Sequence, residues 1–181
     1  MINPNDRSTS PTAAAFVLLA SALAVLAGCG YRLRGTGSSL PPRIRTMSVP
    51  MFKNQTTRFE LDVKLTRAVI NELVARGRVS LSADPAAADA VLEGEIIGFT
   101  ANPIGFSGAN QADKYNITVT AKVTLREKSS AEPLFANPSF VYQQEYDVPP
   151  GSSFESVQTE AIDKIAEKFA HSLVVSILEG F

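Results

Sequence analysis

Apolar and polar residues alternate without interruption through residues 115–126, the segment YNITVTAKVTLR. The apolar positions are Tyr115, Ile117, Val119, Ala121, Val123 and Leu125, and the polar positions are Asn116, Thr118, Thr120, Lys122, Thr124 and Arg126. This period of two predicts a β-strand, because successive side chains of a strand point to opposite faces of its sheet. One face of the strand should pack on a core, and the other should meet water or a polar partner.

Three other segments have the composition of strands, namely residues 44–52, 90–100 and 139–148. In the last of these segments, Phe140, Tyr142 and Tyr146 are in phase. Residues 101–114 contain glycine, proline and asparagine, which favour turns, so they predict a long loop. Residues 127–133 predict the turn that joins the alternating strand to its partner.

Apolar residues recur at four-residue steps through residues 59–76, and this repeat predicts an amphipathic helix. The apolar face consists of Leu61, Leu65, Val69 and Leu73, and the polar stripe consists of Glu60, Lys64, Arg67 and Asn71. Thr57 and Glu60 have the spacing of a capping box, in which two side chains cover free backbone N–H groups at the start of a helix. Gly77 supplies a C-terminal stop.

A second amphipathic pattern predicts a long C-terminal helix that ends near Gly180. Its apolar face consists of Val157, Ala161, Ile165, Phe169, Leu173 and Ile177. Ser152 and Glu155 have the spacing of a second capping box, so we expect this helix to begin beside them.

The order of these elements predicts an α+β fold. Two helices and about four strands should form a two-layer sandwich, with both helices on one face of a mixed sheet. The helix at 59–76 connects two strands, and this crossover should make them parallel. The other face of the sheet then carries the polar row of residues 116–126.

The only cysteine, Cys29, follows an apolar run at residues 13–28. This run is shorter than the ~20 residues of a membrane-spanning helix and has the length of a signal peptide's apolar region. Residues 26–29, LAGC, resemble the lipobox of bacterial lipoprotein precursors. The resemblance implies cleavage after Gly28 and lipidation of Cys29, and Gly30 in the next position points to the outer membrane. An ordinary secretory signal with a nearby cysteine is the alternative.

The sequence therefore divides into a signal peptide at residues 1–28, a lipidated tether at 29–43 and a single domain at 44–181. The tether is rich in glycine, serine and proline. At full extension it spans at most ~50 Å. Several acyl chains would anchor it stably, whereas one chain binds a membrane only marginally.

The composition favours a binding or structural protein over an enzyme. The formal net charge of −1 and the isoelectric point near 5.9 argue against nucleic-acid binding, which needs a basic surplus. Lipidation of Cys29 would leave no thiol for a disulfide or a metal, and the single histidine, His171, has no second ligand near it in the sequence. We expect no catalytic residue, no metal and no cofactor.

Four cations follow the exposed side and the ends of the alternating strand: Lys114, Lys122, Arg126 and Lys128. Lysine and arginine in such a row can pair with the phosphate groups of a glycolipid. The alternative is surface charge that discourages sheets from aggregating.

Two other features of this region are candidates for chemistry. Glu93 and Glu95 lie two residues apart and thus on one face of a strand, where paired carboxylates can bind a hard cation or transfer protons. A solvated strand face is the alternative for this pair. The segment IGFSG at residues 104–108 predicts exposed apolar side chains in a loop that can touch a membrane or a partner.

Three segments, in this order around the predicted helix, resemble the LptE family of lipopolysaccharide-assembly lipoproteins: CGYRLRG at 29–35, LPPRIRTMSVPMFKNQTTR at 40–58 and ADAVLEGEI at 88–96. The resemblance implies an anchor in the inner leaflet of the outer membrane and a plug position inside the β-barrel protein LptD. It also implies help in assembling that barrel, and binding and delivery of lipopolysaccharide. The glycolipid whose phosphate groups Lys114, Lys122, Arg126 and Lys128 are expected to bind would then be lipopolysaccharide. The fold it implies, two helices on a four-stranded sheet, agrees with the pattern above.

Residues 44–56 and the helix that follows also resemble periplasm-facing lipoproteins that regulate peptidoglycan synthases or form part of secretion channels. A regulator of peptidoglycan synthases would need a long disordered reach from its lipid. The tether here is short, so it favours a protein that acts close to the outer membrane over a regulator of peptidoglycan synthases.

Overall fold

The computed structural model describes residues 40–107 and 111–180. Its elements are β1 (Thr46–Ser48), β2 (Lys53–Asn54), α2 (Leu61–Arg76), β3 (Ser80–Leu81), β4 (Ala90–Phe106), β5 (Ala112–Glu127), β6 (Pro133–Asp147) and α3 (Phe154–Glu179). The predicted signal peptide, Cys29 and most of the tether lie outside the described residues.

The strands form one mixed sheet in the order β3-β1-β4-β5-β6, and β2 also pairs with β4. The long strands β4, β5 and β6 are antiparallel. The short strand β1 pairs in parallel with β3 and β4, both of which follow α2 in the chain. Six strands replace the expected four, because the segment at 44–52 and its continuation form two short parallel pieces and residues 80–81 add a third. The predicted α+β class and mixed sheet are confirmed.

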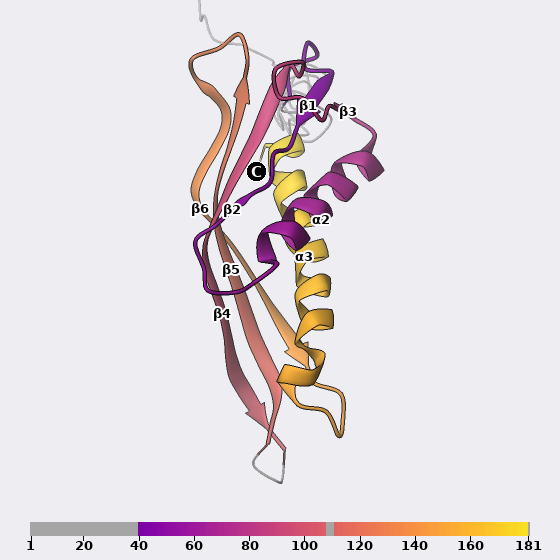
Figure 1. Ribbon diagram of the computed structural model, residues 1–181, viewed down its shortest axis with the longest axis vertical. Helices are drawn as coiled ribbons and strands as arrows, with labels where there is room; N and C mark the ends of the chain where they lie inside the picture. Colours follow the sequence, from indigo (N-terminus) through magenta and orange to yellow (C-terminus); the bar gives the residue numbers. More distant parts are fainter. Residues whose placement is uncertain (1–39, 108–110, 181) are drawn as a thin grey trace, which may run out of the picture. The chain divides into compact units, whose positions relative to one another are not determined.

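Both helices lie on the same face of the sheet, as Figure 1 shows. The core between the layers is apolar, and its largest fully buried side chains include Phe52, Met47, Leu65, Leu92 and Phe169. Phe169 of α3 meets Phe140 of β6 edge to face, with 5.4 Å between the ring centroids. The helices therefore leave the other face of β4, β5 and β6 uncovered within the described chain.

The alternating pattern of β5 is confirmed by burial. Ile117, Val119, Ala121, Val123 and Leu125 are fully buried, and the polar residues between them are exposed or half-buried. One face of β5 thus packs under the helices, and the polar row lies on the uncovered face.

The predicted loop at residues 101–114 is wrong in its main part, since β4 continues to Phe106 and β5 begins at Ala112. Ala101 pairs with Ile117 and Pro103 with Tyr115. Beyond Ile96 no strand pairs with the outer side of β4 in the described chain, so Pro103 lies on an edge, where its missing N–H costs no ladder bond. The register of β4 against β5 shifts next to Gly98 and Gly105, so the apolar and polar residues of this segment do not alternate regularly.

The capping box predicted for α2 is also wrong. The helix begins at Leu61, and Glu60 before it adopts a left-handed conformation with φ of 60° and makes no side-chain cap hydrogen bond. The preceding turn is fixed by Asn54, whose Oδ1 accepts from the backbone N–H of Thr56 and whose Nδ2 donates to the carbonyl of Arg58. Asparagine and threonine side chains can bond nearby backbone groups in place of a regular helical pattern, and here they hold the turn before α2.

The other helix ends are closer to expectation. Gly77 and Gly180 end α2 and α3 in left-handed conformations, with φ of 61° and 73°, as predicted. The capping box of α3 is formed by Ser153 and Ser156, one residue later than the predicted pair Ser152 and Glu155. Serine can replace glutamate in this reciprocal pair because its hydroxyl also accepts a backbone N–H bond.

Within residues 40–107 and 111–180, no helix combines the length and the apolar character needed to cross a bilayer.

Candidate functional site

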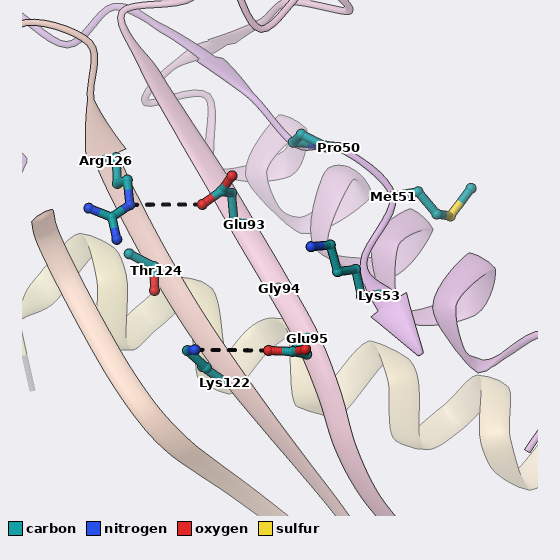
Figure 2. Close-up of a pocket in the computed structure, with 9 residues that line it drawn as sticks. All are labelled: Pro50, Met51, Lys53, Glu93, Gly94, Glu95, Lys122, Thr124 and Arg126. Atoms are coloured by element: carbon teal, nitrogen blue, oxygen red, sulfur yellow. Dashed lines mark ion pairs between the residues drawn. The ribbon is translucent and has the colours of Figure 1, made fainter. Parts of the chain in front are cut away.

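A cavity of about 240 Å³ opens beside the uncovered face of the sheet, where β2 meets β4 and β5. Its charged lining residues are Lys53, Glu93, Glu95, Lys122 and Arg126 (Figure 2). These side chains come from three strands, β2, β4 and β5. The cavity depends on the pairing of β2 with β4, because this pairing brings Lys53 beside the other four residues.

The two acidic and two basic residues of β4 and β5 pair with one another across the strands. Lys122 Nζ lies 3.9 Å from Glu95 Oε2, and Arg126 Nε lies 3.8 Å from Glu93 Oε2. Gln55 also donates to Glu95. The carboxylate pair is therefore neutralised by neighbouring cations, and no group of three His, Cys, Asp or Glu residues arranged to hold a metal occurs in the described ranges.

Lys53 is a cavity residue that the sequence did not indicate. It lies opposite Glu95 in the parallel pairing of β2 and β4, and its ammonium group is directed toward β4 (Figure 2). It makes no ion pair with any described residue. Only the pairing of strands about 40 residues apart brings it here, and no local pattern signals that pairing.

The structure separates the other two predicted lipopolysaccharide-binding residues from this cavity. Lys114 lies eight residues along β5 from Lys122, about 26 Å at the rise of a strand. Its Nζ lies 3.3 Å from Asp147 and 3.6 Å from Glu145, and the hydrogen bond to Asp147 raises the pKa of Lys114 above its usual value. Lys128 follows the end of β5 and donates to the carbonyl of Ala86.

The three cations of the cavity can pair with an anionic group, although Glu93 and Glu95 line the same cavity. Exposed ion pairs such as Lys122–Glu95 and Arg126–Glu93 contribute only about 0–1 kcal/mol each to stability. A phosphate oxygen that replaces a carboxylate as the partner of Arg126 or Lys122 makes charge-assisted hydrogen bonds of at least equal strength. Lys53 supplies a further cation without breaking any ion pair.

The rest of the uncovered face is polar, and its charges gather toward its far end, where Lys114 pairs with Glu145 and Asp147. Thr100, Thr118 and Gln143 form one row across the three long strands, and Asn102 and Asn116 begin the next. The side-chain oxygen of Asn116 is buried and has no hydrogen-bond partner in the part of the chain described.

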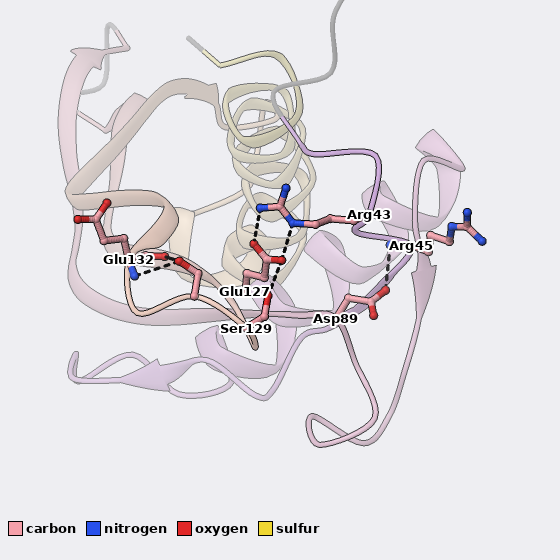
Figure 3. A network of polar contacts seen from close by, with 7 residues as sticks. Arg43, Arg45, Asp89, Glu127, Ser129 and Glu132 are labelled. Carbon is pink, nitrogen blue, oxygen red and sulfur yellow. Dashed lines mark hydrogen bonds and ion pairs between the residues drawn. The ribbon is translucent and has the colours of Figure 1, made fainter.

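A second polar network fixes the start of the domain to the sheet (Figure 3). Arg43 donates from Nε and Nη2 to the two carboxylate oxygens of Glu127, at 2.6 and 2.8 Å. The hydrogen bonds from Arg43 and Ser129 lower the pKa of Glu127 from 4.5 to about 2. Asp89 accepts from the backbone N–H groups of Thr46 and Arg45, and these bonds lower its pKa.

The segment predicted as an exposed apolar loop lies mostly on β4. Ile104 and Phe106 are exposed, as expected, although they belong to the strand. His171 lies on the surface of α3, where its Nδ1 contacts Glu72 of α2 at 3.1 Å. It therefore takes part in a contact between the two helices.

A model of the LptE family, described as lipopolysaccharide-assembly, matches residues 44–177. The chain belongs to this family. Comparison with curated proteins finds no match. LptE proteins are assembly proteins and not enzymes, and the membership confirms the resemblance seen in the sequence. The protein is accordingly an outer-membrane lipoprotein of lipopolysaccharide assembly.

Two solved structures have a similar fold, with TM-scores of 0.50 or more, and a third matches with a lower score. A hypothetical protein from Chlamydia trachomatis is 11% identical with a TM-score of 0.51, over 76% of this chain and 97% of its own. A protein from Xanthomonas campestris is 11% identical with a TM-score of 0.50, over 75% and 85% of the two chains. The rare lipoprotein B from Shewanella oneidensis is 15% identical with a TM-score of 0.42, over 73% and 96%.

Proposed function

We propose that this LptE-family protein is held by lipid on Cys29 at the periplasmic side of the outer membrane. There it plugs an LptD-type β-barrel, helps to assemble that barrel and assists delivery of lipopolysaccharide to the cell surface. The family match over residues 44–177 carries this proposal.

The uncovered sheet face supports the plug position. The lumen of an outer-membrane barrel is polar, so a plug needs a polar surface toward it. Thr118, Thr120 and Thr124 lie on this face beside the paired charges of the cavity.

We further propose that Lys122 and Arg126 bind the phosphate groups of lipopolysaccharide, with Lys53 as a third cation at the same cavity. Lys114 and Lys128 do not line this cavity, and each has a partner elsewhere: Lys114 pairs with Asp147, and Lys128 donates to the carbonyl of Ala86. They would contact other phosphates or sugars of an extended glycolipid.

The partner is tested by purifying the tagged, lipidated protein from outer membranes in mild detergent and identifying what co-purifies. A stoichiometric barrel protein of the lipopolysaccharide-transport type is the expected result. Recovery of a peptidoglycan synthase or a secretion channel in its place would contradict the plug and support the other resemblance.

The phosphate site is tested by reversing Lys122 and Arg126 to Glu together. We expect lipopolysaccharide binding at low salt to fall by at least about tenfold, since two lost phosphate contacts are worth more than the 1.4 kcal/mol of a tenfold change. The matched control reverses Lys164 and Lys168, which changes the net charge equally on α3. Unchanged binding in the first variant, or an equal loss in both, would remove the cavity from the proposal.

A further inference from the structure

A cavity of about 680 Å³ opens beside the first residues of the described chain, next to the segment that joins α2 to β3. Its lining is mainly apolar and includes Leu40, Ile44 and Val79. Arg45 and Arg78 supply its charges, and no acidic side chain of the described residues lines it. In this it differs from the cavity beside β2, which is lined by both acids and bases.

The two arginines of this cavity have no anionic partner in the described chain. The backbone N–H of Ser80 donates to the carbonyl of Arg45 at 2.8 Å, and this bond holds β1 beside the segment that carries Arg78. Both arginines are exposed, and neither guanidinium forms a hydrogen bond or an ion pair with a residue in the described ranges. Guanidinium groups bind phosphate through two parallel N–H···O bonds, so two of them at one cavity suit a phosphate group.

The acidic residues between β3 and β4 bond to backbone groups instead of to these arginines. Asp89 accepts from the backbone N–H groups of Arg45 and Thr46, and the side chain of Arg45 points away from Asp89 (Figure 3). Asp84 accepts from the backbone N–H of Ala86 at 2.8 Å. The positive charge at the cavity is therefore not compensated by an ion pair within the described ranges.

The place of the cavity along the chain indicates what it meets. Leu40 and Ile44 are buried, and Arg43 pairs with Glu127, so the chain is fixed to the domain from Leu40 onward. From the proposed lipid site at Cys29 to Leu40 the chain advances eleven residues, which span about 40 Å at most. The proposed anchor therefore keeps this end of the domain, with its two arginines, within that distance of the bilayer surface.

We propose that Arg45 and Arg78 bind the phosphate group of an anionic phospholipid in the leaflet that holds the anchor, and that the apolar lining of the cavity receives the adjoining part of the same lipid. This inference rests on the proposed function, which supplies the lipid on Cys29. A phospholipid presents both a phosphate and apolar chains, and an anionic bilayer attracts cations that come within a Debye length of it, ~8–10 Å. The contact holds the domain at the bilayer surface, whereas the tether alone lets the domain move away from it.

The test uses the full, tagged, lipidated protein in vesicles of phosphatidylethanolamine and phosphatidylglycerol, with a photo-crosslinking residue at position 42, which is exposed and lines the cavity. We expect an adduct with phosphatidylglycerol. Arg45→Gln with Arg78→Gln should reduce its yield by at least about tenfold, since two cations at an anionic surface together contribute more than a tenfold change in binding. Arg67→Gln with Lys168→Gln removes two exposed cations from the helices and is the matched control. Thermal unfolding of each variant should match that of the unsubstituted protein, because all these residues are exposed.

Vesicles of phosphatidylethanolamine and phosphatidylcholine, which carry no net charge, should give a similarly low yield. An undiminished yield in these vesicles or in the cavity variant, or an equal loss in the control variant, would overturn the phospholipid site and leave the proposed function intact. In outer membranes, adducts that contain only a barrel protein or only lipopolysaccharide would overturn it as well. Mass analysis of Cys29 measures the anchor separately: if this residue carries no lipid, the proposed anchor itself fails, and the phospholipid site falls with it.

Discussion

A single ion pair, between Arg43 and Glu127, joins two segments that are far apart in the sequence. Arg43, the last residue of the predicted tether, donates to both carboxylate oxygens of Glu127 at the end of β5. The Glu127 side chain is only 5% exposed, and Ser129 donates a further bond to it. Because these bonds favour the charged carboxylate in the folded protein, they couple folding to pH.

We expect Glu127→Gln to destabilise the domain at neutral pH and to matter less in acid. The folded pKa of Glu127, about 2, lies below its ordinary 4.5, so its contribution is fully present above about pH 4.5 and is lost as the pH falls toward 2. Urea unfolding at pH 7 and pH 3 measures this difference. Glu132→Gln, in the same turn, is the control, and an equal effect of Glu127→Gln at both pH values would contradict the coupling.

Gly94 is a second residue whose identity is fixed by a close approach. A Cβ built at this position would lie 2.6 Å from ring carbons of Phe52, the buried residue that precedes β2. We expect Gly94→Ala to cost about 1–3 kcal/mol through overpacking. At Gly98 the nearest atom would lie at 3.4 Å, so Gly98→Ala serves as the matched control. Chemical denaturation measures both, and equal stabilities would contradict the close contact.

At the scale of elements, α3 contributes most of the helical side of the core. Its buried face includes the predicted residues Ala161, Ile165, Phe169, Leu173 and Ile177. The helix is 26 residues long and packs against α2, β5 and β6. The pattern of four-residue steps was sufficient to predict this face, because a helix with one buried side repeats at that period.

Phe169→Ala should lower the free energy of unfolding by about 3–5 kcal/mol, because it removes a fully buried ring that contacts Phe140. Equilibrium urea unfolding measures the loss. Val141→Ala removes an exposed side chain of β6 and should be nearly neutral. A near-neutral result for Phe169→Ala would mean that α3 packs in another register.

At the scale of the whole molecule, the proposed anchor decides where the domain works. Cys29→Ala should leave residues 44–181 folded, since the buried apolar core, which also includes Leu40, lies otherwise within that range. We expect the variant to lose its outer-membrane location, because lipidation needs the thiol. Membrane fractionation, with circular dichroism as the control for folding, measures both properties. A variant that stays with the outer membrane in the usual amount would contradict the lipid anchor.

The sequence by itself determined the α+β class, the buried faces of β5 and α3, and the family. These depend on local periodicity and on residue order, which burial on one side of an element imposes directly on the chain. The stops at Gly77 and Gly180 were predictable for the same reason, because a left-handed residue at a helix end favours glycine.

Only the tertiary structure decided how the charged residues combine. Glu93 and Glu95 were one candidate site and Lys122 and Arg126 another, yet pairing of β4 with β5 makes them partners, and pairing of β2 with β4 adds Lys53 to them. The same long-range pairing turned the expected loop at 101–114 largely into strand. Contacts between residues far apart in the sequence depend on which strands are neighbours and on their register. The local pattern of apolar and polar residues determines neither of these.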